Sequence, residues 1–129
     1  MLKKTGSKNV NISKSFNSLI GEHSSFKGDI KCEGAIRIDG EIIGEIKAAE
    51  DVVIGPNAKV EGDIYGNIVQ ISGIVKGNIF AKYTVRLCTT ASLYGDIETQ
   101  NFITEEGSFF LGKCTMTNID SNEMNKGKK

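Results

Sequence analysis

The fold is decided by a five-residue element that the chain repeats, in the order apolar, any, Gly, polar, Ile. It reads FKGDI at residues 26–30, IIGEI at 42–46, VEGDI at 60–64, VKGNI at 75–79, LYGDI at 93–97 and, in degenerate form, FLGKC at 110–114. The six glycines are separated by 16, 18, 15, 18 and 17 residues. A repeat of about 17 residues indicates an architecture in which each unit packs only on its neighbours.

Between these copies lies a second element, apolar–any–apolar, which is typical of a very short β-strand. It occurs at residues 36–38, 52–54, 69–71, 85–87 and, more weakly, 102–104. Strands of three to five residues cannot form a stable sheet alone, but they can when successive windings stack. The sequence therefore predicts an all-β fold, a parallel β-solenoid of about six short windings with apolar residues turned inward. The repeated glycines are expected inside strands, facing a crowded core.

Length and composition agree with one small β domain. The chain has 129 residues, of which 15 are Gly, one is Pro and none is Trp. It has no run of eighteen apolar residues, and its first residues are rich in Lys without an apolar stretch, so we expect neither a membrane-spanning helix nor a secretory signal. Three cysteines, Cys32, Cys88 and Cys114, match neither a disulfide framework nor a zinc site. We interpret them as small core residues in a reducing cytoplasm.

The formal net charge of zero hides an uneven distribution of charge. Residues 1–18 carry four lysines and no acid, residues 19–116 carry fourteen acids and nine bases, and residues 117–129 carry two acids and three lysines, giving +4, −5 and +1. A net acidic core argues against nucleic-acid binding, which needs a basic face. We expect a disordered basic tail at 1–16, the solenoid at 17–116 and a second disordered tail at 117–129.

Neither end of the predicted solenoid has the polar cap that monomeric solenoids use to protect their open backbone groups. The leading end begins within the repeat, at Leu19 and Ile20, and the trailing end, GSFFLGKCTM, becomes more apolar. End-to-end association is therefore expected, through residues of the terminal windings: Leu19, Ile20, Phe102, Phe109, Phe110 and Leu111.

Two further surfaces are candidates for contacts. Equivalent outward-facing residues of successive windings are expected to form rows on the surface, and a purely solvated row would be polar. Apolar residues stand in two of the rows, Ile43 and Tyr94 in one and Val53 and Ile103 in another, which suggests a lateral contact between solenoids. The chain start combines apolar Met1 and Leu2 with basic Lys3 and Lys4, a possible contact to an anionic membrane surface. The alternative for this tail is a solubilising spacer.

The ordered series of degenerate windings resembles the bactofilins, which are bacterial cytoskeletal proteins. The resemblance covers about residues 17–116 and is carried by LIGEHSSFKGDIKCEGAIRIDGEIIGEI (19–46), VVIGPNAKVEGDIYGN (52–67), VKGNIFAKYTVRL (75–87) and NFITEEGSFFLGKC (101–114). It implies a right-handed β-helix of triangular cross-section that polymerises without nucleotide into apolar filaments. It also implies a scaffold for cell shape or envelope processes, cytoplasmic and peripheral at the inner face of the cell membrane. Implied partners are further copies of the chain, that membrane, and envelope or peptidoglycan-remodelling proteins.

The competing class is an enzyme, a hexapeptide-repeat acyltransferase. Residues 54–59, IGPNAK, fit one such repeat, but the six-residue phase breaks at Gly66. Such an enzyme needs a histidine as general base, and the chain has only His23, in a polar segment typical of a turn. We therefore assign no catalytic, cofactor-binding or metal-binding residue. The polar residues after the glycines, Asp29, Glu45, Asp63, Asn78 and Asp96, are expected to form a solvated outward ladder, with a row of calcium sites as the alternative.

Overall fold

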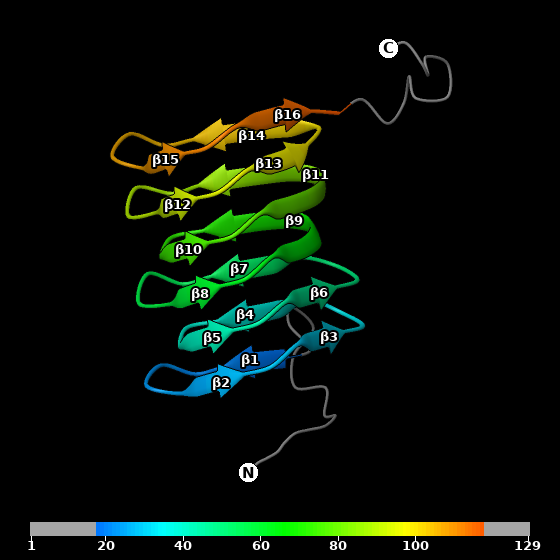
Figure 1. Ribbon diagram of the computed structural model, residues 1–129, viewed down its shortest axis with the longest axis vertical. Coiled ribbons are helices and arrows are strands. Elements are labelled where there is room, and N and C mark those ends of the chain that lie inside the picture. The colour runs from blue at the N-terminus through cyan, green and yellow to red at the C-terminus, as the bar shows by residue number, and fades with distance from the viewer. Residues whose placement is uncertain (1–17, 118–129) are drawn as a thin grey trace.

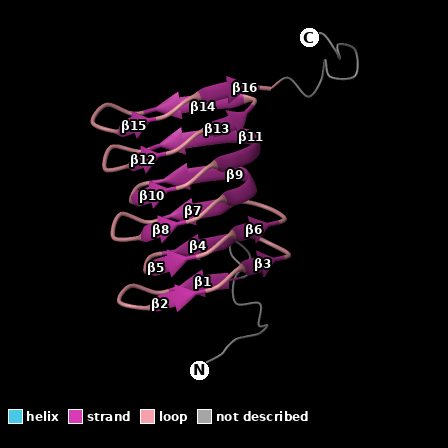
Figure 2. Cartoon of the chain, viewed as in Figure 1, coloured by secondary structure: helices cyan, strands magenta, loops and turns pink. Residues whose placement is uncertain are grey.

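The computed structural model describes residues 18–117, which form a parallel β-solenoid of six windings (Figure 1). In Figure 1 the chain climbs from bottom to top while the strands in front run to the right and those behind run to the left, so the solenoid is right-handed. Within the described residues the chain contains strands, turns and bends but no helix (Figure 2). It accordingly offers no helix there that could cross a membrane.

Each winding supplies a strand to each of three faces. The first face holds β1 (Ser18–Ile20), β4 (Ile36–Ile38), β7 (Val52–Ile54), the second halves of β9 (Ile64–Ile71) and β11 (Ile79–Leu87), and β14 (Asn101–Thr104). The second face holds β2 (Ser25–Lys27), β5 (Glu41–Ile43), β8 (Lys59–Glu61), β10 (Ile74–Lys76), β12 (Ser92–Tyr94) and β15 (Phe109–Leu111). The third face holds β3 (Ile30–Cys32), β6 (Ile46–Ala48), the first halves of β9 and β11, β13 (Ile97–Thr99) and β16 (Cys114–Met116).

The core is a set of columns in which equivalent side chains of successive windings stack. On the third face Ile46, Ile64, Ile79 and Ile97 lie in register and are completely buried. On the second face the column runs Ile42, Val60, Val75 and Leu93. Because every winding repeats the apolar–any–apolar pattern in register, the alternation confines the apolar side chains to the interior. The predicted β-solenoid of about six windings is confirmed.

The repeated glycines lie at a corner, between the second and third faces, and the predicted position inside a strand facing the core is wrong. All six have a positive φ, from 137° to 156°. From the second winding onward, a Cβ on the glycine would overlap the carbonyl oxygen of the glycine one winding below. Glycine is therefore needed at this corner because the backbone has a positive φ and because successive windings come into close contact there, not because the core is crowded.

The polar residues that follow these glycines do more than face solvent. The side chains of Asp29, Asp63, Asn78 and Asp96 each accept a hydrogen bond from the main-chain N–H of the equivalent residue one winding further on, at 2.9–3.0 Å. Asn78 can take the place of an acidic residue in this series because its side-chain amide oxygen accepts a hydrogen bond as a carboxylate oxygen does. The prediction of a merely solvated ladder is corrected accordingly. Each of these side chains accepts a hydrogen bond from a main-chain N–H at the corner that would otherwise have no protein partner.

The three cysteines are free and differ in surroundings. Cys32 is 7% exposed and belongs to the core, as predicted. Cys114 packs partly buried against the core at the trailing end. Cys88 follows β11 in a turn and lies outside the core cluster, so the prediction of a core residue is wrong there.

Candidate assembly surfaces

The leading end of the solenoid exposes inward side chains that no winding covers. Strands β1, β2 and β3 pair only with the winding that follows them. Phe26 stands in register with Ile42, yet Phe26 is 41% exposed while Ile42 is 1% exposed. Ile20 and Ile30 are likewise only partly buried. This end therefore presents an apolar surface bordered by open backbone groups.

The trailing end presents a second apolar surface. Phe102 and Phe110 stand in register with buried residues of the winding below, and their rings meet edge to face with centroids 5.3 Å apart. Cys114 and Met116 complete this surface, with their sulfur atoms 3.6 Å apart. Burial raises the pKa of the Cys114 thiol, so this sulfur remains a neutral, packed group.

The six residues predicted for the end-to-end contact all lie in the terminal windings but in two orientations. Ile20, Phe102 and Phe110 turn inward and contribute to the end surfaces. Leu19, Phe109 and Leu111 point out from the side faces and are 62%, 46% and 61% exposed. Sequence reasoning missed Phe26 and Ile30 at the leading end, although Phe26 opens the first copy of the repeat and so had to lie uncovered.

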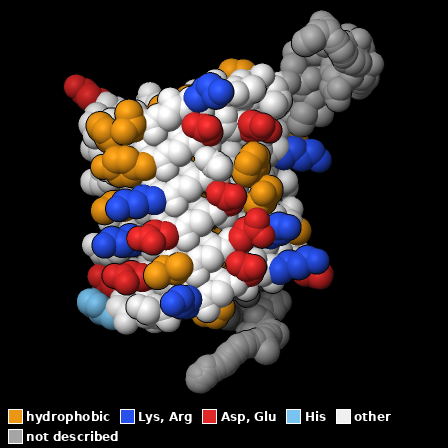
Figure 3. Space-filling model, in the orientation of Figure 1, with side chains coloured by type: hydrophobic (Ala, Val, Ile, Leu, Met, Phe, Trp, Pro, Cys, Tyr) orange, Lys and Arg blue, Asp and Glu red, His pale blue; other side chains and the backbone are white. Residues whose placement is uncertain are grey.

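The second face carries two residues predicted for lateral contact, Ile43 and Tyr94, which are 49% and 40% exposed. They belong to one outward row that the strand register aligns: Lys27, Ile43, Glu61, Lys76, Tyr94 and Leu111. The ring centroids of Tyr94 and Phe109 lie 5.5 Å apart. Hydrophobic side chains gather over β12 and β15, at the upper left of Figure 3.

The first face carries the other predicted pair, Val53 and Ile103, of which Val53 is half-buried and Ile103 is 46% exposed. Two charged pairs lie beside them on this face. Arg37 lies 2.8 Å from Asp39, and Arg86 lies 2.7 Å from Glu105. The hydrogen bond from Arg86 lowers the pKa of Glu105, which keeps that exposed carboxylate ionised. The charged groups of this face are thus held in local ion pairs.

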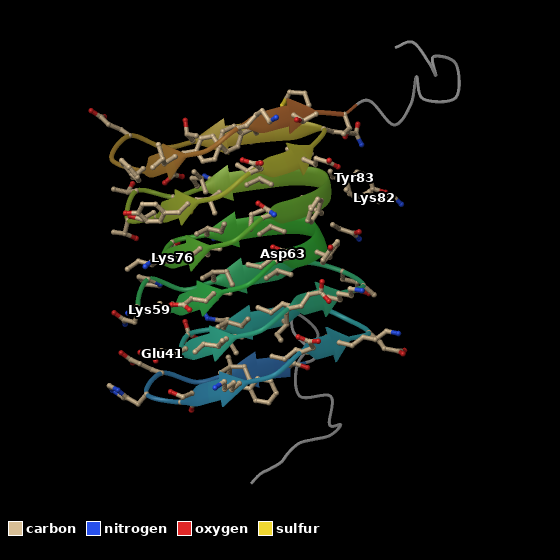
Figure 4. All side chains as sticks on the ribbon, viewed as in Figure 1. Glu41, Lys59, Asp63, Lys76, Lys82 and Tyr83 are labelled. Carbon is tan, nitrogen blue, oxygen red and sulfur yellow. The ribbon has the colours of Figure 1, made fainter. Side chains whose placement is uncertain are left out.

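The third face holds an aromatic cluster that sequence reasoning missed. The rings of Tyr65 and Phe80 stack with centroids 4.7 Å apart, and the Lys47 ammonium lies 5.3 Å from the Tyr65 centroid. Beside them is a shallow hollow of about 340 Å³. At its rim the bend in β11 projects Lys82 and Tyr83 outward (Figure 4). The two rings stand 15 residues apart in equivalent slots, so alignment of the repeats could have shown the contact.

His23, the one histidine, lies exposed in the turn between β1 and β2 with φ of 71°. It borders a polar hollow of about 320 Å³ with Glu22, Asp39 and Glu41. Within residues 18–117 no group of three potential ligands is placed to hold a metal ion. The residues predicted to contact a membrane, Met1, Leu2, Lys3 and Lys4, lie outside the described residues.

Comparison with known proteins points to a single family. A family model described as Bactofilin, polymer-forming cytoskeletal, matches residues 18–115. Bactofilin BacO of Myxococcus xanthus is 32% identical over 100 residues, which make up 78% of this chain and 79% of BacO. Bactofilin BacP of the same organism is 24% identical over 104 residues, 81% of this chain but only 43% of BacP.

Two solved structures resemble the solenoid. A cryo-EM reconstruction of Thermus thermophilus bactofilin double helical filaments matches with a TM-score of 0.70 and 27% identity, covering 78% of this chain and 99% of that chain. A crystal structure of a mutant of the same bactofilin matches with a TM-score of 0.65 and 29% identity, covering 68% and 98% of the respective chains.

Proposed function

Because this chain belongs to the bactofilin family of polymer-forming cytoskeletal proteins, we propose that it is a bacterial scaffold that assembles itself into filaments without nucleotide. The observation that carries the proposal is the pair of open, apolar ends: partly exposed Phe26 at one, Phe102 and Phe110 at the other. End-to-end stacking would continue the core columns and cover the open backbone groups at the same time. That the related T. thermophilus protein forms double helical filaments supports the proposal.

The proposal assigns no chemical step to the chain. The one histidine sits on an exposed turn, and its positive φ of 71° is a feature of the turn itself. The scaffold would serve cell shape or envelope growth and hold envelope or peptidoglycan-remodelling proteins in place. Its site of action would be the cytoplasmic face of the cell membrane.

Nucleotide-free assembly tests this function directly. The purified full chain, examined by negative-stain microscopy with no nucleotide or metal added, is expected to form long filaments. Added ATP or GTP should change neither their number nor their length, because the stacking surfaces are apolar. A monodisperse trimer would instead favour the acyltransferase class, and filaments that appear only with nucleotide would contradict the proposed mechanism.

Membrane attachment through Met1, Leu2, Lys3 and Lys4 is the second part of the proposal. Each lysine near an anionic leaflet contributes about 1 kcal/mol, so one tail binds weakly, but a filament presents many tails and gains avidity. Deleting residues 2–8 is expected to reduce sedimentation with anionic liposomes while filaments remain unchanged. Neutral liposomes are the control, and equal sedimentation of the two chains with anionic liposomes would show that the tail is a spacer.

A further inference from the structure

The hollow of about 340 Å³ on the third face follows the corner at which each winding turns from the third face to the first. Small residues line it, because Ala48, Gly66 and Ala81 occupy equivalent positions of successive windings. The half-buried rings of Tyr65 and Phe80 stand beside them. The hollow therefore offers apolar area to a side chain that enters it.

A β-bulge in β11 forms one rim of this hollow. The register between β9 and β11 shifts there, so Lys82 and Tyr83 together stand opposite the single residue Asn67. The winding above holds the bulge in place, because Gln100 and Asn101 donate side-chain hydrogen bonds to its two carbonyl oxygens, at 3.2 and 3.1 Å. A bulge redirects side chains, and this one points Lys82 and Tyr83 outward, at the right edge of Figure 4.

Two lysines flank the hollow at different heights. Within residues 18–117 no ion pair involves Lys82, whose ammonium lies 5.3 Å from the centroid of the Tyr83 ring. Lys47, two windings below, lies 3.7 Å from a carboxylate oxygen of Glu45, and its side chain is 55% exposed. The one acid that lines the hollow, Glu98, stands one winding above Lys82. A ligand that fits these charges carries acidic groups at the two lower levels.

The described part of the chain ends at the upper rim of this hollow. Thr117 lines it, and the main-chain N–H of Thr117 donates a hydrogen bond of 2.7 Å to the carbonyl oxygen of Thr99. In Figure 1 strand β16 ends at the right, above β13 and the bend of β11. The residues that follow are Asn118, Ile119, Asp120, Ser121, Asn122 and Glu123. This segment combines an apolar residue with two acids, which is the chemistry that suits the hollow and its two lysines.

The spacing of the two acids matches the spacing of the two lysines. Paired strands lie about 4.8 Å apart, so Lys82 lies about 10 Å, and Lys47 about 19 Å, below the winding that ends the described chain. An extended chain advances about 3.3 Å per residue, so Asp120 reaches about 10 Å and Glu123 about 20 Å from that winding. Side chains alternate along an extended segment, so Ile119 and Glu123 share one side and Asp120 takes the other.

We propose that residues 118–123 run back over the third face of their own solenoid and dock in this hollow. Asp120 pairs with Lys82 at the bulge. Glu123 pairs with Lys47 two windings below. Composition predicts a disordered tail for the end of the chain, and the proposal instead gives the first part of that tail a binding site on the same chain.

The other contacts of the docked segment are compatible with these pairs. Ile119 packs against the ring of Phe80, and uncharged Asn118 lies at the level of Glu98, so no acid of the segment faces that carboxylate. Exposed ion pairs are individually weak, but the segment is tethered at Thr117, which gives it a high effective concentration at the hollow. The docked segment leads away from the trailing end and leaves it open. The inference holds for a single solenoid and does not depend on filament formation.

Carbodiimide cross-linking tests the two ion pairs in the full chain, because the reagent joins an amine to a neighbouring carboxylate as an amide. Mass spectrometry is expected to find one amide between Lys82 and Asp120. A second should join Lys47 to Glu123. Each should exceed the link from Asp120 to Lys113 at least about tenfold, because a docked carboxylate is concentrated at its own lysine. Lys113 is the matched reference, since it is exposed in the last winding but does not line the hollow. Equal yields at Lys113 and Lys82 would overturn the docking.

A mixture of isotope-labelled and unlabelled chains, assembled together, shows whose segment occupies the hollow. Cross-links that join two peptides of the same isotope content are expected. Links between labelled and unlabelled peptides at the level of chance mixing would show that the segment docks on a second copy, and would overturn the proposal for the same chain.

Charge reversal distinguishes pairing from chance proximity. Asp120→Lys and Lys82→Glu each place like charges together at the bulge, so each is expected to lower the yield of the link between Lys47 and Glu123 at least about fivefold. The double variant Asp120→Lys/Lys82→Glu should restore that yield. Lys59→Glu on the second face is the matched control and should leave it unchanged, and circular dichroism verifies the fold of each variant. An unchanged yield in either single variant, no recovery in the double variant, or a loss in Lys59→Glu would overturn the inference.

Discussion

Gly62→Ala is expected to lower the free energy of unfolding of the solenoid by at least about 3 kcal/mol. Much of the variant protein should then be unfolded at physiological temperature. Gly62 has φ of +147°, and a Cβ on it would overlap the carbonyl oxygen of Gly44 and stand 2.6 Å from that residue's carbonyl carbon. The backbone must therefore adopt a conformation costly to alanine, and the windings must also move apart. A domain of this size has only about 5–15 kcal/mol of net stability to lose.

Gly21→Ala is the matched control for Gly62→Ala. A Cβ on Gly21 would meet nothing within 4 Å, and this glycine has no positive φ. Urea unfolding followed by circular dichroism should give Gly21→Ala a midpoint close to that of the parent chain and Gly62→Ala a much lower one, with the same slope if both unfold in one step. Equal midpoints for the two variants would show that the glycine corner tolerates a side chain.

The glycine corner also shows where prediction from the sequence stops. The repeat of about 17 residues was sufficient to predict the solenoid, because strict alternation in short strands leaves few other folds. It placed Gly62 inside a strand facing the core, whereas Gly62 lies at the corner between β8 and β9. It could not say why glycine is needed, because the close contact with the Gly44 carbonyl exists only after the windings stack. The same is true of Asp63, whose backbone partner, the N–H of Asn78, belongs to the next winding.

The assembly surfaces were predictable to different degrees. The bactofilin resemblance is confirmed, and the terminal windings are apolar as the sequence indicated. The alternation of the repeat turns Phe110 inward and Leu111 outward, and the structure has Leu111 61% exposed. Leu19 and Leu111 were nevertheless grouped with the inward residues of the terminal windings as one contact, although both point out from the side faces. The stack of Tyr65 on Phe80 was missed because each aromatic lies in a different repeat and neither interrupts an apolar pattern.

The end-to-end contact itself is tested most strongly at Phe110. Its ring is only partly buried in the isolated solenoid, where it packs against the core and against Phe102. A neighbouring subunit stacked on this end would bury the rest of the ring, a contribution of about 1.5–3 kcal/mol for an aromatic of this kind. An arginine placed there must instead lose its hydration without a partner, at a cost of several kcal/mol more.

Phe110→Arg is therefore expected to give a folded, soluble monomer or dimer in place of filaments, whereas Tyr94→Arg should at most separate paired filaments that remain long. Both substitutions introduce the same charge in neighbouring windings, but Phe110 faces the end surface and Tyr94 the second face. Size-exclusion chromatography with light scattering, beside circular dichroism to verify the β spectrum, distinguishes the outcomes. If Phe110→Arg still forms long filaments while Tyr94→Arg becomes monomeric, the side faces and not the ends build the polymer, because a buried unpaired charge interrupts only the contact that contains it.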